Sequence, residues 1–126
     1  MFNMTDLYGD IAAFKDLTNL VRLTFNPGNT GVKLNIYGDI ANISNKPNLL
    51  YAELGINNLS GSINNLINLP NLRTFSIGYN QNVTGDIDLL SKYTTLVSIW
   101  CDNTSVSGSI NQLANLTNLQ ILAVNT

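Results

Sequence analysis

Leu72-Arg73-Thr74-Phe75-Ser76-Ile77 is the stretch of sequence that decides the fold, because its pattern occurs five times along the 126-residue chain. In each copy the first, fourth and sixth residues are apolar. The copies begin at positions 20, 49, 72, 96 and 119, so they are spaced 29, 23, 24 and 23 residues apart. A nearly fixed period in this range is typical of a solenoid in which similar coils stack on one another. The other copies are Leu20–Phe25, Leu49–Leu54, Leu96–Cys101 and Leu119–Val124.

A second element, Gly-x-Ile, precedes each strand and has an apolar residue two places before its glycine. A recurring glycine at one point of every coil suggests a bend that needs a positive φ or a close approach between coils. After the isoleucine the apolar residues step by three, as in Ile63, Leu66, Leu69 and Leu72. This spacing favours a short 3₁₀-like or irregular return over an amphipathic α-helix. The five glycines are Gly9, Gly38, Gly61, Gly85 and Gly108.

These elements resemble the leucine-rich repeat family. The resemblance is carried by the L-x-x-L-x-L strands, by Asn57 and Asn80 three places past two of them, and by Leu59-Ser60-Gly61-Ser62-Ile63. The L-x-G-x-I element is most similar to the subclass first associated with plant receptors, a pattern that bacterial and phage proteins also use. The resemblance implies an α/β solenoid that is mostly β. It would be a right-handed coil with a parallel sheet on the concave face and 3₁₀-like or irregular returns on the convex face.

The five repeats predict a single leucine-rich-repeat domain over residues 1–126. The fifth repeat ends directly after its strand, with no capping element. An uncapped solenoid exposes apolar core and an unpaired strand edge. We therefore expect either that the chain is a fragment or that its C-terminal edge associates with another subunit.

The asparagines depart from the family pattern in two ways. The family asparagine is replaced by Gly28 in the first repeat and by Thr104 in the fourth, so an unbroken asparagine ladder is not expected. A fuller asparagine column stands directly before the strands, and Thr95 interrupts it. Buried amides there could satisfy the backbone of the adjacent coil. This column consists of Asn19, Asn48, Asn71 and Asn118.

Lys46 falls in a column that is otherwise largely apolar, with Leu17, Leu69, Tyr93 and Leu116 at the corresponding positions. An unpaired lysine in a core position is costly. Because a lysine stem can lie along apolar surface while its ammonium stays in water, we expect the Lys46 ammonium to reach solvent.

Composition excludes several classes of function. Charged residues make up 11% of the chain and the net charge is −2, whereas nucleic-acid binding depends on clustered Lys and Arg. No apolar run is long enough to cross a bilayer, so membrane insertion is not expected. The chain has no histidine, and its lone Cys101 occupies an apolar strand position that favours buried packing.

The acidic residues are not predicted to form a catalytic or metal site. Glu53 and Asp102 are predicted on the concave strands or at their ends, two coils apart and without an evident pocket, which disfavours a glycosidase pair. Asp10, Asp39 and Asp86 share the middle position of Gly-x-Ile, but serines replace them in two repeats. A polar residue at a solvent-facing bend explains this row better than calcium. We expect no enzyme activity and no cofactor.

The outward side chains of the concave strands are the predicted binding surface. Alternation along a strand sends the fourth and sixth residues inward and the third, fifth and seventh outward. Most outward residues are small, with Trp100 and Tyr51 standing above them, and Arg22 and Thr24 belong to the same columns. A wide, shallow, mixed surface with aromatic anchors suits recognition of a protein or a glycan. The predicted site comprises Tyr51, Glu53, Thr74, Ser76, Ser98, Trp100 and Asp102.

Three functions are compatible with this surface. The first is a non-enzymatic module that binds another protein through the concave face. The second is a structural spacer in a surface or virion assembly, and the third is a carbohydrate-binding module that uses Trp100 and Tyr51. Each favours an extracellular, cell-surface or virion location over a cytoplasmic one.

Overall fold

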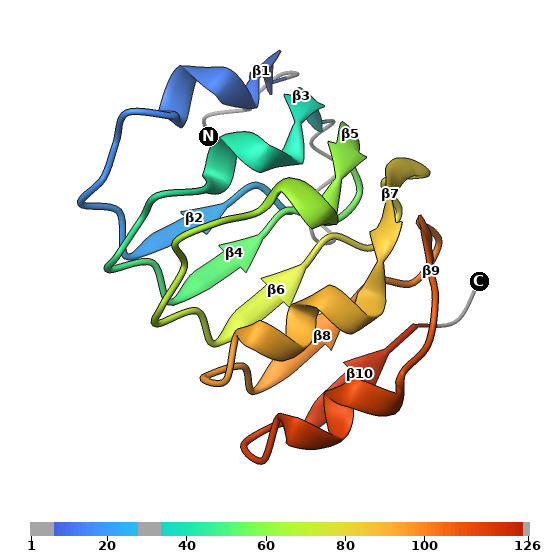
Figure 1. The fold of residues 1–126 in the computed structure, drawn as a ribbon. Helices are drawn as coiled ribbons and strands as arrows, with labels where there is room; N and C mark the ends of the chain where they lie inside the picture. Colours follow the sequence, from blue (N-terminus) through green and yellow to red (C-terminus); the bar gives the residue numbers. More distant parts are fainter. Residues whose placement is uncertain (1–6, 28–33, 125–126) are drawn as a thin grey trace.

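The computed structural model describes residues 7–27 and 34–124, which wind through five stacked coils (Figure 1). Each coil contains a strand of one sheet, a 3₁₀ return and a strand of a second sheet. The concave sheet has the order β10-β8-β6-β4-β2, and all its strands are parallel. Its strands are β2 (Arg22–Thr24), β4 (Tyr51–Glu53), β6 (Thr74–Ser76), β8 (Ser98–Trp100) and β10 (Ile121–Ala123).

The second sheet, here called the lateral sheet, lies at the other edge of the coils (Figure 1). It also has five parallel strands, β1 (Leu7–Asp10), β3 (Leu34–Asp39), β5 (Asn58–Ser62), β7 (Asn82–Asp86) and β9 (Ser105–Ser107). The returns between the sheets are η1 (Ile11–Phe14), η2 (Ile40–Ile43), η3 (Ile63–Asn65), η4 (Ile87–Lys92) and η5 (Asn111–Asn115). The predicted 3₁₀-like returns are therefore confirmed, as is the mostly-β solenoid.

The core confirms the predicted phase of the concave strands. The fourth-position residues Leu23, Ala52, Phe75 and Ile99 are buried. Leu122, the fourth residue of the last copy, is 39% exposed because the described chain places no coil beyond β10. Alternation along each strand thus divides an apolar interior from a polar outer face.

The lateral sheet was not predicted, because a recurring glycine is typical of a bend rather than of a strand. Gly61 has φ +87, and a Cβ on it would collide with the Asp39 carboxylate of the preceding coil. Both reasons proposed for the glycine therefore apply, yet the chain around it stays extended and pairs with its neighbours: Gly61 lies opposite Val83 in the register of β5 and β7.

In the first four coils the polar residue after the glycine caps the 3₁₀ return, and in the fifth Ser109 lies one residue before the cap position. Asp39 Oδ1 accepts a hydrogen bond from the Ala41 amide at 2.9 Å, and Ser62 Oγ accepts one from the Asn64 amide at 3.1 Å. Capping satisfies an amide that has no partner inside the helix. It explains why Asp and Ser alternate in this row, since either oxygen can accept the bond. The same bond is made by Asp10, Asp86 and Ser109.

Two buried asparagines join neighbouring coils through their side chains. Asn80 Nδ2 donates to the Leu54 carbonyl of the preceding coil at 2.9 Å, and its Oδ1 accepts from the Leu59 amide at 3.0 Å. Asn57 makes the corresponding bonds to the Phe25 carbonyl and the Ile36 amide. Among the described residues, the Thr104 hydroxyl bonds only within its own coil: it donates to the Cys101 carbonyl at 2.7 Å and accepts from the Val106 amide at 3.3 Å. Gly28 lies outside the described residues.

The prediction of buried amides directly before the strands is wrong. Asn71 is exposed, although its Nδ2 does donate to the Pro47 carbonyl of the preceding coil at 2.7 Å. The amide can reach that carbonyl from the surface, so the bond does not require burial. The other three members of the column, Asn19, Asn48 and Asn118, are exposed as well.

The prediction that the Lys46 ammonium reaches solvent is also wrong. Lys46 is fully buried, and its Nζ donates to the carbonyls of Phe14 at 2.8 Å and Lys15 at 3.3 Å. These carbonyls end the η1 return, where the helix leaves acceptors without partners. Burial lowers the pKa of Lys46 below 10.5, while the carboxylate of Asp16 acts in the opposite direction.

Candidate binding surface

The structure places the predicted site residues in adjacent rows on the outer face of the concave sheet. Tyr51, Thr74 and Ser98 are register partners across β4, β6 and β8. Glu53, Ser76 and Trp100 form the next row. Asp102 follows β8 and is half-buried. The strand register therefore brings six of the seven predicted residues to one face, and Asp102 follows two residues after the end of β8.

Arg22 changes the chemistry of the Tyr51 end of this face. Its guanidinium carbon lies 4.3 Å from the centre of the Tyr51 ring, and Nη1 lies 3.3 Å from Glu53 Oε1. Thr24 Oγ1 donates to the other carboxylate oxygen of Glu53 at 3.5 Å. The Tyr51 ring and the Glu53 carboxylate thus already have an intramolecular partner. The sequence contained a signal for this contact, because Arg22 and Tyr51 occupy the same position in neighbouring strand copies.

The Trp100 end of the face is more open. The Trp100 side chain is 40% exposed, and beside its row the hydroxyls of Thr74 and Ser98 lie 3.2 Å apart. Among the described residues, the Asp102 carboxylate has no hydrogen-bond partner. A Cβ at Gly78 would collide with this carboxylate. A small-residue floor with one indole and one carboxylate that has no partner among the described residues can accept an apolar group together with a hydrogen-bond donor.

Burial makes Cys101 unreactive. The side chain is buried, and burial, with a smaller contribution from the Asp102 carboxylate, raises the pKa of its thiol to about 12. The thiolate is the nucleophilic form of cysteine, and it is scarce at neutral pH with such a pKa. This agrees with the packing role predicted for Cys101.

The turns after the concave strands carry two exposed apolar residues that were not among the predicted site residues. Ile56 and Tyr79 have φ values of +59 and +60, and their side chains are 50% and 55% exposed. A positive φ is unfavourable for a β-branched residue such as Ile56, and strained positions of this kind cluster at ligand sites. Backbone bonds hold both, because the Ile56 amide donates to the Gly78 carbonyl and the Tyr79 amide to the Asp102 carbonyl. We call Ile56 and Tyr79 the rim residues.

The rim residues had a readable signal in the sequence. Gly55-Ile56-Asn57 and Gly78-Tyr79-Asn80 each place a large apolar side chain between two turn-forming residues. Asn103, which occupies the corresponding position in the next coil, has φ +53 and is a residue type that tolerates this conformation. Because they are exposed apolar residues where asparagine fits better, the rim residues are candidates for contact with a partner.

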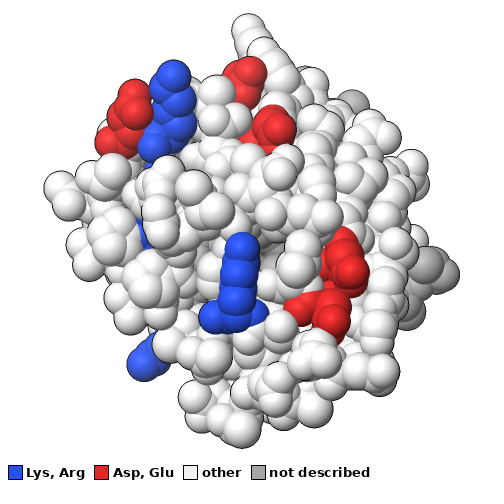
Figure 2. Space-filling view, viewed as in Figure 1, with Lys and Arg blue, Asp and Glu red and all other residues white. Residues whose placement is uncertain are grey.

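The described residues contain no metal-binding group and no membrane-spanning helix. Within 7–27 and 34–124 there is no cluster of three or more His, Cys, Asp or Glu side chains that could hold a metal ion. In the same ranges no helix has the length and apolar character needed to cross a bilayer. Figure 2 shows one face of the molecule, on which charged side chains are few and lie in small groups with large uncharged areas between the groups.

Two parallel sheets joined by 3₁₀ returns, with buried asparagines between coils, define a leucine-rich-repeat solenoid, and the chain has this fold. The plant peptide hormone receptor RGFR1, solved in complex with RGF2, is similar at 29% identity and a TM-score of 0.78, covering 94% of this chain and 19% of that chain. The PEPR1–AtPEP1 structure is similar at 25% identity and a TM-score of 0.76, covering 98% of this chain and 17% of that chain.

The present chain spans about a fifth or less of the length of these two solved chains. No protein-family model matches the chain, and no curated protein matches it. At the level of fold, the similar structures place it among leucine-rich-repeat solenoids.

Proposed function

We propose that this chain is a non-enzymatic module that binds a protein or peptide partner on the outer face of the concave sheet. The observation that carries the proposal is the exposed Trp100 indole beside a floor of small hydroxyl side chains. Buried aromatic anchors often dominate the binding energy of an interface, and a tryptophan that is already ordered loses little freedom on binding. The rim residues add apolar surface along the same edge of the sheet.

Charge at this face indicates which partner groups would be complementary. Arg22 already neutralises Glu53, so the Asp102 carboxylate is the available acceptor near Trp100. A partner that places an apolar side chain on the indole and an amine or guanidinium near Asp102 would match both features. The fold's similarity to a peptide hormone receptor in complex with RGF2 supports a peptide or protein partner in an extracellular or cell-surface setting.

A peptide display selection on the full chain tests this proposal. Peptides enriched on the wild type are synthesised, and their affinities are measured for Trp100→Ala and for the control Tyr37→Ala, which alters a 43% exposed tyrosine of the lateral sheet. We expect Trp100→Ala to weaken binding by roughly thirtyfold or more and the control to leave it unchanged. Enriched peptides that ignore Trp100 would overturn the assignment of this face. Binding of glycans but no peptides would favour the carbohydrate function.

A further inference from the structure

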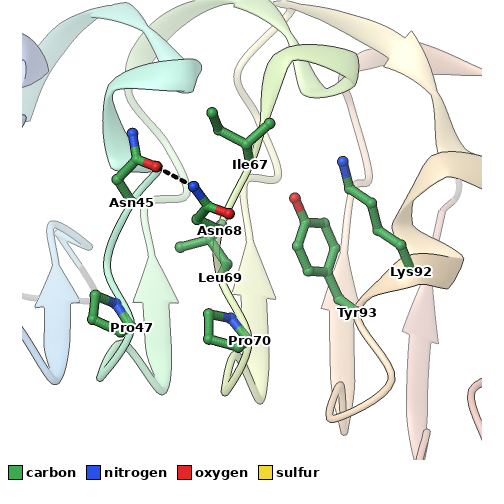
Figure 3. Close-up of a pocket in the computed structure, with 8 residues that line it drawn as sticks. All are labelled: Asn45, Pro47, Ile67, Asn68, Leu69, Pro70, Lys92 and Tyr93. Carbon is green, nitrogen blue, oxygen red and sulfur yellow. Dashed lines mark hydrogen bonds between the residues drawn. The ribbon is translucent and has the colours of Figure 1, made fainter.

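A groove of about 690 Å³ lies on the return side of the coils, away from the concave sheet (Figure 3). It is lined by Asn45 and Pro47 of the second coil, by the return segment 67–70 of the third, and by Lys92 and Tyr93 of the fourth. Its apolar surface includes Ile67, which is 50% exposed, and the exposed Pro70. We call it the return groove.

The groove exists because two neighbouring returns fail to pair. Between the second and third coils, the Asn45 and Lys46 amides donate to the carbonyls of Ile67 and Asn68 at 3.0 and 3.1 Å. The corresponding amides of the third coil are those of Asn68 and Leu69. The fourth coil has no extended segment opposite them, because η4 continues as a helix to Lys92.

The Asn68 and Leu69 amides are left without acceptors in the described chain. Asn68 has φ +55 and Asn45 has φ +58, so the two turns share a conformation and direct their amides alike, toward the following coil. Unpaired backbone donors beside a groove are a site where an added extended segment can bind by main-chain hydrogen bonds.

Tyr93 supplies a second, independent indication of a ligand. Its side chain is only 6% exposed, and its hydroxyl is a buried polar group without a hydrogen-bond partner in the described structure. Buried hydroxyls nearly always have a partner, so an exception asks for an explanation. Figure 3 shows the hydroxyl end of the ring between the Ile67–Asn68 segment and the Lys92 side chain, and the ring lines the groove. Burial raises the pKa of Tyr93 to about 12, so the hydroxyl remains a donor at neutral pH.

The charge of the groove narrows the choice of occupant. Among the described residues that line it, Lys92 is the one charged residue and none carries a carboxylate. Lys92 Nζ donates to the Leu66 carbonyl at 2.7 Å, which leaves other ammonium protons for a second acceptor. The groove therefore offers several donors in a row, one positive charge and exposed aliphatic surface.

We propose that the return groove binds an extended acidic peptide segment of a partner protein. Its backbone carbonyls accept hydrogen bonds from the Asn68 and Leu69 amides and from the Tyr93 hydroxyl. An aliphatic side chain packs on Ile67 and Pro70, and a carboxylate lies near Lys92. This site is on the opposite side of the coils from the concave face and does not depend on it.

A random peptide display library tests the proposal, selected on the full chain and counter-selected on Ile67→Glu. That substitution adds a carboxylate to an exposed position of the groove without altering the core. We expect enriched peptides to contain carboxylate and aliphatic residues. Tyr93→Phe should weaken their binding by about fivefold or more, the effect of one lost hydrogen bond, and Trp100→Ala should leave it unchanged.

Amide measurements identify the contact directly. On adding an enriched peptide, the Asn68 and Leu69 amide protons should shift downfield and exchange more slowly with solvent, while those of β6 and β8 stay as they are. The proposal is overturned if nothing is enriched, or if the enriched peptides lack carboxylates and ignore Tyr93→Phe. It is also overturned if sedimentation shows a dimer that Ile67→Glu abolishes, because a second copy would then be the occupant.

Discussion

Two junctions between coils place a polar side chain in the same largely leucine column. The two buried polar groups differ in whether they have a hydrogen-bond partner. Lys46, at the junction of the first and second coils, is fully buried and bonded to the carbonyls of Phe14 and Lys15. Tyr93, at the junction of the third and fourth, is 6% exposed with an unpartnered hydroxyl. A buried polar group is tolerated at one junction because the preceding coil offers acceptors, and at the other no acceptor is left.

Tyr93 lacks an acceptor because of the residue before it, Lys92. Leu66 occupies the position in the third coil that Phe14 occupies in the first, and its carbonyl is taken by Lys92 rather than by the column residue. At both junctions the equivalent carbonyl, that of Phe14 or of Leu66, accepts a hydrogen bond from a lysine ammonium group. At the second junction the ammonium comes from the return helix, which leaves Tyr93 without an acceptor and the neighbouring groove open.

The largest expected effect comes from the apolar member of the column between the two junctions. Leu69 is 1% exposed, and Leu69→Ala should lower the free energy of unfolding by about 2–5 kcal/mol, through lost transfer energy and a cavity. Chemical denaturation measures it, with Ile67→Ala as an exposed control expected to stay within about 0.5 kcal/mol. If Leu69→Ala matched that control, the assigned repeat register would be incorrect.

Lys46→Met should lower the free energy of unfolding by about 1–3 kcal/mol. Methionine keeps most of the buried stem but leaves the Phe14 and Lys15 carbonyls without their charged donor, and that is the usual cost of an unsatisfied buried group. Denaturation at neutral pH tests it. An unchanged or greater stability would mean that the desolvation of the ammonium outweighs both hydrogen bonds.

The two junctions should respond to alkaline pH in opposite directions. The pKa of Lys46 is lowered on folding, so the unfolded state binds more protons and this residue makes stability rise with pH between its folded pKa and 10.5. The pKa of Tyr93 is raised from 10.0 to about 12, so its contribution is fully present below pH 10 and is lost as pH approaches 12. Unfolding free energies of Lys46→Met and Tyr93→Phe, each subtracted from the wild type across this range, should show opposite slopes. Slopes of the same sign would contradict the assignment.

Tyr93→Phe alone should be neutral or stabilise the free protein by up to about 1 kcal/mol at neutral pH, because it removes an unpaired buried hydroxyl and keeps the ring. Thermal unfolding with Tyr37→Phe as the matched control measures this. A loss above about 1 kcal/mol would show that the hydroxyl has a partner in the free protein.

The smallest effect is expected where polar groups pair at the surface. The Arg22 side chain is 57% exposed and that of Glu53 28%, so solvent screens their attraction. Arg22→Gln should lower the free energy of unfolding by less than about 1 kcal/mol. Comparing it with Glu53→Gln and with the double variant in a denaturation cycle isolates the pair. If the coupling free energy between Arg22 and Glu53 were as large as the effect of Lys46→Met, the expectation that exposed pairs stabilise less than buried ones would be wrong.

The sequence predicted the coils, the concave strands and their phase. Burial of one face of each strand requires apolar residues at fixed positions, and these recur along the chain with a period that can be counted. It missed the lateral sheet although the signal was there. In Leu59-Ser60-Gly61-Ser62-Ile63, residues of one face recur at every second position, as in a strand. The glycine at its centre nevertheless favoured the prediction of a bend.

The polar interior could not be predicted in the same way. Lys46 is buried because carbonyls more than thirty residues away accept its protons, and Asn71 bonds to Pro47 from the surface. These partners come from the preceding coil, whose distance and backbone direction are not encoded in the local pattern. The candidate site was predicted as a set of columns, but the pairing of Arg22 with Tyr51 and the strained rim residues needed the backbone.

The caps of the 3₁₀ returns have a consequence for how such an array can grow. Asp10, Asp39 and Asp86 each face a glycine of the next coil that no larger residue could replace, namely Gly38, Gly61 and Gly108. Each coil thus carries a glycine that fits the coil before it and a cap that fits the one after it. A duplicated coil contains both the glycine and the cap, so whole coils can be copied in tandem without compensating changes. Duplicating residues 61–84 should give a folded, longer array with a steeper denaturant dependence of unfolding, because more surface is buried.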